Sequence, residues 1–270
     1  MSVLSITDMS IALPSGADRP FAVKDCSYEI AMGEILCVVG ESGSGKSMTA
    51  NALMGLLPEG VTVANGTAAF GGKDILQVSE IEQRALRGDR IAMIFQEPMT
   101  ALNPLMRIGD QIAEVFEAHK RHTPSERKAR ALDLVREVGL PDPEKIIRAY
   151  PFQLSGGQRQ RAMIAMSLAL EPELLIADEP TTALDVTTQA QILKLILDLR
   201  ERRGMAVMFI THDFGVVAEI ADRVIVMRHG EIVERGTATE VLENPQHDYT
   251  KRLLEAIPTG LVPQSVAVEK

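Results

Sequence analysis

The sequence reads Gly40-Glu41-Ser42-Gly43-Ser44-Gly45-Lys46-Ser47. This stretch fits the pattern Gly-x4-Gly-Lys-[Ser/Thr] of a phosphate-binding loop. An apolar run typical of a buried strand, residues 35–39, comes before it. Residues 47–57 follow it, and they are rich in helix formers and contain no proline. A strand, a glycine-rich loop and a helix are the local structure that the motif requires, so the sequence predicts a nucleotide phosphate site at the start of a helix.

The chemistry of this loop depends on its glycines and on two polar side chains. Glycines allow backbone N–H groups to turn inward around the β- and γ-phosphates, and the helix N-terminus adds a partial positive charge. Lys46 is expected to reach the phosphate oxygens, and the Ser47 hydroxyl is expected to hold Mg²⁺. A flexible Gly/Ser turn is the alternative, which the flanking strand and helix disfavour. The predicted nucleotide contacts are Gly40, Glu41, Ser42, Gly43, Ser44, Gly45, Lys46, Ser47 and Met48.

Length, composition and charge limit the class of protein. With 270 residues the chain can bury a core and form one or two domains. The net charge of −9 and the aromatic content of 4%, with no Trp, disfavour a surface that binds nucleic acid. No apolar run reaches the ~18–20 residues of a membrane span, and no signal peptide is visible. The two cysteines, Cys26 and Cys37, are expected to be buried apolar residues in a reducing cytosol.

Apolar runs that alternate with helical patterns predict an α/β fold. Residues 91–95, 174–177 and 206–210 are continuous apolar runs, as in parallel strands covered on both faces. Residues 1–33 and 61–76 contain shorter strands and turns, which we expect to form an antiparallel β layer beside the core. The alternation of strands and helices predicts that the core sheet is mainly parallel.

A helical segment interrupts the predicted core. Residues 107–150 show helical periodicity with charged residues on the outside. Thr123, Pro124 and Glu126 have the pattern of an N-cap, a first-turn proline and a capping-box glutamate, and Gly139 is expected to end that helix. We therefore assign residues 97–154 to a helical subdomain, residues 1–96 and 155–250 to a nucleotide-binding core, and residues 251–270 to a short C-terminal tail.

A pair of acidic residues follows one of the core strands. Asp178 and Glu179 come directly after residues 174–177, at the strand end where open α/β sheets bind ligands. Asp178 is predicted to hold the metal, and Glu179 is predicted to orient and polarise the attacking water as general base. A solvated Asp-Glu pair at a strand end is the alternative, because such pairs are common.

A second pair of glycines opens a later helix, in Leu154-Ser155-Gly156-Gly157-Gln158. Ser155 fits an N-cap, so this helix end is either a plain cap or a second anion site. The stretch resembles the signature sequence of ATP-binding cassette (ABC) ATPases, where it also precedes the acidic pair. The resemblance implies a P-loop NTPase (RecA-like) fold, ATP and Mg²⁺ as cofactors, and a head-to-tail dimer. In such a dimer this helix caps the nucleotide held by the partner's phosphate loop.

Three further positions match the pattern of the ABC family. Gln96, directly after a predicted strand, resembles the Q-loop glutamine, which joins Ser47 and Asp178 at the metal and senses the attacking water. His212 resembles the switch histidine that contacts the γ-phosphate, and a structural histidine is its alternative. The stretch Ala183-Leu184-Asp185 resembles the D-loop at the dimer seam, where Asp185 also fits a helix N-cap.

The sequence departs from the family at the expected adenine site. ABC ATPases usually stack the adenine on an aromatic ring in the N-terminal strands, near residues 11–17 here. This sequence has Ile11, Leu13 and Ala17 in that segment, and the nearest ring is Phe21. Phe21 is therefore the candidate for base stacking. ATP binding should survive with weaker base selectivity, because phosphate contacts dominate.

Three stretches resemble the ATPase subunits of dipeptide, oligopeptide and nickel importers, namely residues 95–104, 150–153 and 244–250. The resemblance covers most of residues 1–257. It implies a second ABC ATPase subunit, identical or related, together with two transmembrane permease subunits and an extracytoplasmic solute-binding protein. The chain would then be a peripheral protein at the cytoplasmic face of the plasma (inner) membrane and would have no nucleic-acid partner.

Other classes of protein remain open at this point. A soluble ABC-class ATPase acting on nucleic acid or ribosomes is the main alternative, but such proteins usually carry two cassettes, a coiled-coil insertion or a basic surface. A non-catalytic regulator would be expected to lack Glu179 or Lys46, and an exporter subunit is disfavoured by the importer-like stretches. The run His119-Lys120-Arg121-His122 is expected to be a solvated helix end rather than a metal site.

Overall fold

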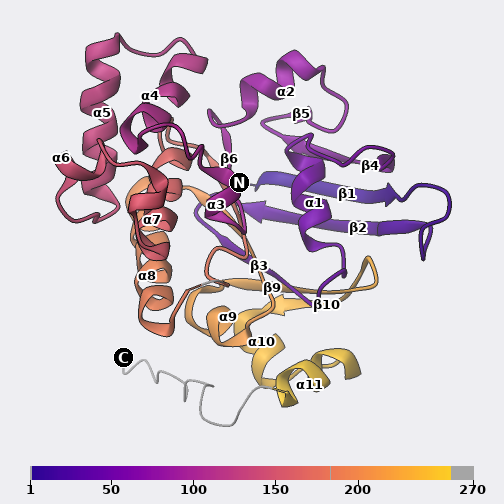
Figure 1. Ribbon diagram of the computed structural model, residues 1–270. Helices are drawn as coiled ribbons and strands as arrows, with labels where there is room; N and C mark the ends of the chain where they lie inside the picture. The colour runs from indigo at the N-terminus through magenta and orange to yellow at the C-terminus, as the bar shows by residue number, and fades with distance from the viewer. Residues whose placement is uncertain (1, 183, 257–270) are drawn as a thin grey trace. The chain divides into compact units, whose positions relative to one another are not determined.

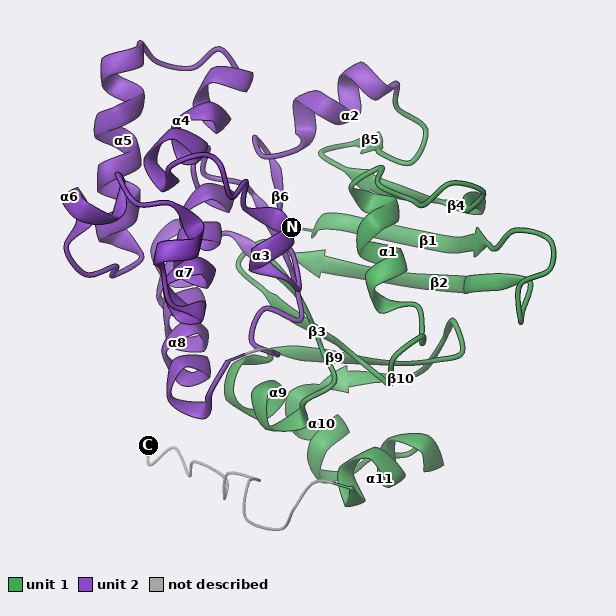
Figure 2. Ribbon diagram, in the orientation of Figure 1, with its two compact units in different colours: residues 1–78, 207–270 green, residues 79–206 purple. Residues whose placement is uncertain are grey.

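The structure is a computed structural model, and it describes residues 2–182 and 184–256. The chain packs as two compact units, residues 1–78 with 207–270 and residues 79–206 (Figure 2). Each unit combines strands and helices (Figure 1), so the predicted α/β class is confirmed. The division into a nucleotide-binding core, a helical subdomain and a tail is a different grouping of the chain, and it stays a prediction.

The first unit contains an antiparallel sheet in the order β2-β1-β4-β5. Ile6 on β1 lies opposite Tyr28 on β2 and Ala68 on β4, and all three side chains are buried. Hydrophobic burial on this face stabilises the sheet. The antiparallel layer predicted from the sequence is therefore confirmed. Its strands are β1 (Ser2–Ala12), β2 (Phe21–Ala31), β4 (Thr62–Phe70) and β5 (Lys73–Asp74).

The first unit also contains the strands that carry the phosphate loop. Strand β3 pairs in parallel with β8 and with β9, and β9 pairs with β10 in an antiparallel hairpin. Every residue of β3 and β8 is buried, as expected of parallel strands covered on both faces. Helix α1 contacts β1 and β2, α9 contacts β3, and α10 contacts β9 and β10. The elements are β3 (Ile35–Val39), α1 (Lys46–Leu53), β8 (Ala206–Thr211), α9 (Phe214–Ile220), β9 (Arg223–Arg228), β10 (Glu231–Thr237), α10 (Ala238–Glu243) and α11 (Asp248–Glu255).

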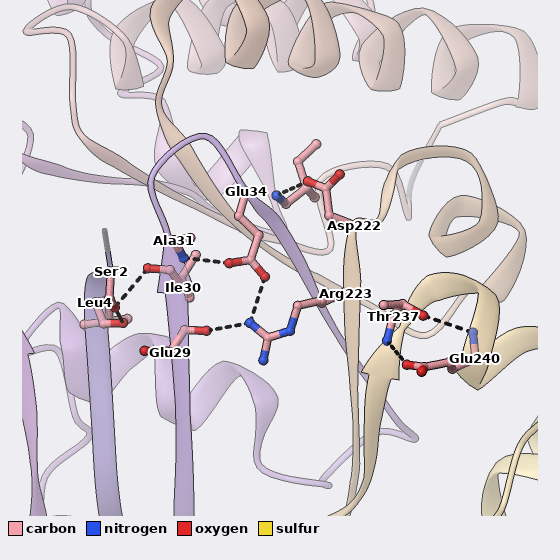
Figure 3. A network of polar contacts seen from close by, with 11 residues as sticks. Ser2, Leu4, Glu29, Ile30, Ala31, Glu34, Asp222, Arg223, Thr237 and Glu240 are labelled. Carbon is pink, nitrogen blue, oxygen red and sulfur yellow. Dashed lines mark hydrogen bonds and ion pairs between the residues drawn. The ribbon is translucent and has the colours of Figure 1, made fainter.

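A polar network fixes the start of β3, a few residues before the phosphate loop (Figure 3). The carboxylate of Glu34 accepts a hydrogen bond from the Ala31 backbone N–H at 2.6 Å and lies 3.0 Å from the Arg223 guanidinium. The carboxylate of Asp222 accepts a hydrogen bond from the Ile35 backbone N–H at 2.8 Å. Hydrogen bonds to charged groups are stronger than neutral ones, so this network ties the turn before β3 firmly to the start of β9.

The second unit contains the parallel pair β6 (Ile91–Ile94) and β7 (Leu174–Asp178), in which every residue is buried. Helix α7 packs against β6, and helices α3, α4 and α5 pack against α7. The helices of this unit are α2 (Glu80–Leu86), α3 (Pro98–Ala101), α4 (Ile108–Ala118), α5 (Pro124–Glu137), α6 (Pro143–Ile146), the 3₁₀ helix η1 (Pro151–Gln153), α7 (Gly156–Ser167) and α8 (Val186–Arg203).

The helix signals in the sequence are confirmed, with small shifts at the ends. Thr123 caps α5 and forms a capping box with Glu126, and Gly139 follows that helix with a φ of 67°. Helix α1 ends at Leu53, earlier than the predicted residue 57. It stops there because Gly55 adopts the left-handed conformation, with a φ of 61°, that commonly ends helices.

The predicted C-terminal tail begins within a helix. Residue 251, where the tail was expected to begin, lies inside α11. The rest of the expected tail, residues 257–270, lies outside the described residues. No helix in the described part of the chain is long and apolar enough to cross a membrane.

The start of β6 is joined to the start of β7 by an ion pair. Arg90 Nε and Nη2 lie 2.6 and 2.8 Å from the two carboxylate oxygens of Glu173. Hydrogen bonding to Arg90 lowers the pKa of Glu173 below its ordinary value of 4.5. Because the folded-state pKa is depressed, the stabilisation is present above the unfolded-state pKa and is lost as pH falls through the folded value.

The substitution Arg90→Ala should therefore lower the free energy of unfolding by about 0.5–1 kcal/mol near neutral pH, a small effect because solvent screens the pair. Chemical denaturation of wild type and variant should show this difference shrinking as the pH falls far enough to protonate Glu173. Arg136→Ala is the matched control, since its pair with Glu144 is more exposed and should contribute nothing measurable. A difference for Arg90→Ala that stays constant with pH would contradict this role.

Candidate nucleotide-binding site

The phosphate loop starts where β3 ends and leads directly into α1. Gly40 and Gly45 have φ values of 149° and 108°, which favour glycine. A Cβ at Gly40 would lie 2.2 Å from the Met227 carbonyl oxygen, and a Cβ at Gly45 would lie 2.6 Å from the Ala22 carbonyl oxygen. Close backbone approach therefore requires glycine at both positions, which is the physical basis of the motif.

Lys46 is the first residue of α1 and is only 4% exposed. Its ammonium donates hydrogen bonds to the carbonyl oxygens of Gly40 at 2.7 Å and Glu41 at 3.0 Å, and it lies 3.5 Å from Ser44 Oγ. The loop thus wraps around the ammonium. An anionic phosphate oxygen is a stronger partner for this cation than a neutral carbonyl.

Around Lys46, the other predicted loop residues differ in their exposure. Ser44 is buried, Met48 on α1 is half-buried, and Ser47 is exposed. Glu41, Ser42 and Gly43 are also exposed, so a ligand that arrives from solvent can reach them.

His212 lies at the same strand edge as the phosphate loop. In the parallel register of β3 and β8, Val39 lies opposite Thr211, so the loop and His212 leave neighbouring strands side by side. His212 is exposed, and the next residue, Asp213, caps α9 by accepting a hydrogen bond from the Gly215 N–H at 2.8 Å. This placement agrees with the predicted contact of His212 to a γ-phosphate, which stays a prediction.

Two residues that lie outside the phosphate-loop motif form hydrogen bonds to the loop. The guanidinium of Arg19 donates a hydrogen bond to the Gly43 carbonyl oxygen, and the hydroxyl of Tyr249 on α11 bonds to Glu41. Tyr249 lies within an importer-like stretch of the sequence, but its partner is 208 positions away, and no local pattern reports such a contact. Phe21, the candidate for base stacking, is half-buried at the start of β2 and precedes the Ala22 carbonyl that faces the loop.

In the second unit, the acidic pair lies at the carboxyl end of β7. Asp178 is the last residue of the strand and is 6% exposed. Glu179 follows in the left-handed conformation, with a φ of 46°, and such strained backbone is often found at functional sites. Glu179 Oε2 accepts hydrogen bonds from Gln96 Nε2 at 3.1 Å and from Thr182 Oγ1 at 2.9 Å. The structure therefore brings the predicted general base and the predicted Q-loop glutamine together.

The signature stretch forms the N-terminal end of α7. Ser155 Oγ accepts a hydrogen bond from the Gln158 N–H at 3.3 Å, and Gln158 Oε1 accepts one from the Ser155 N–H at 2.9 Å. The helix begins at Gly156, directly after the predicted N-cap Ser155. Ser155 and Gly156 are exposed. A Cβ at Gly157 would lie 2.6 Å from Thr188 Cγ2, so the close approach of α7 and α8 requires a glycine there.

The D-loop stretch lies beside the signature stretch. Asp185 caps α8 by accepting hydrogen bonds from the Thr188 N–H at 3.0 Å and the Thr188 hydroxyl at 2.7 Å, and these bonds lower the pKa of Asp185. A Cβ at Gly156 would lie 3.9 Å from Leu184 Cδ2. Ala183, the first residue of the predicted D-loop, lies outside the described residues.

The described residues contain no group of three or more His, Cys, Asp or Glu side chains placed to hold a metal. His119 Nε2 lies 3.0 Å from the Arg87 carbonyl oxygen, and the ring of His122 packs against the edge of Phe116 at 5.4 Å. These contacts support a structural role for the histidine run.

The predicted Mg²⁺ ligands all offer oxygen, the donor that Mg²⁺ prefers, and they are Ser47, Gln96 and Asp178.

A glycine-rich loop between a buried parallel strand and a helix that starts with lysine defines a P-loop nucleotide-binding protein. Solved structures agree with this class. The structure matches the dimeric ATP-binding cassette MJ0796 bound to ADP and Pi with a TM-score of 0.77 and 28% sequence identity, covering 87% of this chain and 98% of that one. The structure of cbiO1 from Clostridium perfringens, described as part of an ABC transporter complex, matches with a TM-score of 0.75 and 26% identity, covering 90% and 91% of the two chains.

The sequence profile of the family described as ABC transporter matches residues 23–182, and the chain belongs to this family. The peptidoglycan transport ATP-binding protein YejF of Agrobacterium fabrum is 53% identical over 98% of this chain and 49% of its own length. The dipeptide transport ATP-binding protein DppD is 49% identical in Lactococcus lactis and 48% in Escherichia coli, where the matches cover 95% and 96% of this chain and 74% and 79% of the relatives. The chain thus spans about half the length of the first relative and about three quarters of the other two.

These similarities confirm the predicted P-loop fold, the resemblance to peptide importers and the class of an ABC-type ATPase coupled to transport. They do not favour the alternative of a soluble ABC-class ATPase acting on nucleic acid or ribosomes.

Proposed function

We propose that this chain hydrolyses MgATP to power the uptake of peptides, or of a related small solute such as nickel, through partner membrane subunits. The contact between Glu179 Oε2 and Gln96 Nε2 supports this proposal most directly. It holds a carboxylate in a fixed direction at a strand end where α/β proteins bind ligands. A solvated acidic pair with no catalytic task would not need a second polar side chain to orient it.

Within one chain, the proposed roles follow from the chemistry of each side chain. Lys46 and the loop N–H groups bind the phosphates, and His212 contacts the γ-phosphate. Glu179 orients and polarises the attacking water. Mg²⁺, when bound, neutralises charge on the phosphates. Its proposed ligands are Ser47, Gln96 and Asp178.

A second copy of the chain, or a related subunit, completes the proposed site. The exposed N-terminal end of α7 at Ser155 and Gly156 offers backbone N–H groups and a partial positive charge, which suit a phosphate held by a partner. Asp185 and the neighbouring Val186, which is 83% exposed, are positioned to meet the partner as well. Phe21 is the proposed base-stacking residue.

An exposed apolar surface on the second unit suits the proposed membrane subunits. Phe95, Met99 and Leu105 are 38%, 53% and 84% exposed, which is unusual for large apolar side chains so close in sequence. Through this surface the chain would act as a peripheral subunit on the cytoplasmic face of the inner membrane, beneath two permease subunits. An extracytoplasmic binding protein would deliver the solute.

The substitution Ser155→Arg tests the proposed dimer. In a Glu179→Gln background, which is expected to slow turnover, this change should keep ATP binding by the single chain but abolish ATP-dependent dimerisation, because the long side chain fills the space at the end of α7 that the partner's phosphate would need. Light scattering with and without MgATP measures the dimer, and a fluorescent ATP analogue measures binding.

Ser79→Arg is the matched control, because Ser79 forms the same kind of capping box on α2 of the same unit. With Ser79→Arg added, the Glu179→Gln chain should dimerise as it does without this change. Normal dimerisation of Ser155→Arg would show that α7 does not cap the nucleotide of a partner.

Reconstitution with the permease subunits, followed by stimulation of ATP hydrolysis with peptide- or nickel-loaded binding protein, identifies the solute.

A further inference from the structure

Tyr249 connects the C-terminal helix α11 to the phosphate loop within the first unit. Its hydroxyl donates a hydrogen bond to Glu41 Oε2 at 3.1 Å and accepts one from the Glu41 backbone N–H at 3.1 Å. Tyr249 is only 4% exposed, and the guanidinium of Arg228 lies 4.9 Å from the centroid of its ring. One hydroxyl therefore binds both the side chain and the backbone of a single loop residue.

Helix α11 is itself held in place, so the position of this hydroxyl is fixed. The carboxylate of Glu234 on β10 accepts hydrogen bonds from the Gln246 N–H at 2.6 Å and from the His247 N–H at 3.1 Å. His247 Nδ1 in turn accepts a hydrogen bond from the Tyr249 N–H at 3.1 Å. Burial raises the pKa of the Tyr249 hydroxyl, so it remains a hydrogen-bond donor at neutral pH.

The same loop residue also touches the lysine that the loop surrounds. The Glu41 carbonyl oxygen accepts a hydrogen bond from the Lys46 ammonium at 3.0 Å. The hydrogen bond from the Glu41 N–H to Tyr249 therefore limits the movement of the Glu41 carbonyl. It also limits the movement of the Lys46 ammonium, which is bonded to that carbonyl. A fixed charge binds phosphate better than a mobile one, because less freedom is lost on binding.

We propose that Tyr249 is a positioning residue for the nucleotide site: it holds Glu41, and through Glu41 the ammonium of Lys46, so that α11 contributes to nucleotide affinity. The inference rests on the proposed function of the loop as the ATP site. Tyr249 acts through the loop and takes no part in the chemical step.

The substitution Tyr249→Phe removes only the hydroxyl. It should raise the Kd of the isolated chain for MgATP about fivefold, because both hydrogen bonds that hold Glu41 are lost. The KM for ATP should rise with kcat nearly unchanged, because Tyr249 does not touch the reacting atoms. Tyr28→Phe is the matched control. Tyr28 is a buried tyrosine of the same unit whose hydroxyl faces Met208 Sδ at 3.9 Å, and its loss should leave the Kd unchanged.

Glu41→Ala tests the same contact by changing its other partner. Glu41 is exposed, so this substitution is not expected to disturb folding. It should also raise the Kd, and the Kd of the double variant should rise by less than the product of the two single effects, because both changes remove the bond between the hydroxyl and the Glu41 carboxylate. A Kd for Tyr249→Phe within twofold of wild type, or multiplicative effects in the double variant, would overturn the inference. Failure of the wild-type chain to bind MgATP would instead overturn the proposed function.

Discussion

The substitution Glu179→Gln is expected to leave ATP binding intact and to slow hydrolysis by a factor of about 10²–10⁴, the usual contribution of a general base. The amide keeps the shape of the carboxylate and still offers an oxygen to Gln96 and Thr182. It cannot take a proton from the attacking water. Because ATP then persists, the nucleotide-bound dimer should accumulate. Single-turnover hydrolysis and light scattering in the presence of MgATP measure the two effects.

Glu171→Gln is the control for this change. Glu171 is exposed and also adopts a positive φ, 58°, just before β7 in the same unit, but it has no proposed role in catalysis. Its variant should hydrolyse ATP at the wild-type rate. Near-normal turnover by Glu179→Gln would mean that another group activates the water, and the role given to Glu179 would be wrong.

The second large effect is expected for Lys46→Ala, which should weaken MgATP binding by about 100-fold or more and abolish hydrolysis. The ammonium is the buried positive charge inside the loop, and charge-assisted bonds to phosphate oxygens are among the strongest polar contacts that a protein makes. Isothermal titration with MgATP checks the loss of affinity, and thermal denaturation of the nucleotide-free variant checks that the fold persists.

Lys24→Ala serves as the control for the loss of a positive charge. Lys24 belongs to the same unit, is exposed, and pairs with Glu231 at 2.8 Å. Removing it should leave the affinity for ATP unchanged. If Lys46→Ala bound MgATP like the wild type, the phosphate loop would not be the nucleotide site.

The features that could be predicted from the sequence are those determined by neighbouring residues. The phosphate loop requires glycine at Gly40 and Gly45 for backbone reasons, and these requirements appear directly in the sequence. The capping box of α5 likewise depends on Thr123 and Glu126, which are three positions apart. Continuous apolar runs predicted the buried parallel strands, because strands covered on both faces need apolar side chains on both faces.

Contacts between distant positions could not be predicted in this way. The bond between Tyr249 and Glu41 depends on how α11 docks against β10, which no local pattern records. The left-handed conformation of Glu179 was equally hidden, because non-glycine residues rarely adopt it without support from their surroundings. Resemblance to a family supplied the expected role of Glu179, but not the strained backbone that aims its carboxylate.

The capping box at the start of α7 has a consequence for the selectivity of the proposed dimer. In the single chain, the Gln158 N–H is already occupied by the Ser155 hydroxyl, so a phosphate arriving from a partner must compete with this internal acceptor. Such a cap is worth about 1 kcal/mol. A weakly charged or poorly placed anion gains too little to displace it, whereas a triphosphate presented by a second loop gains more. We therefore expect the proposed dimer to form with the full nucleotide and not with free phosphate alone.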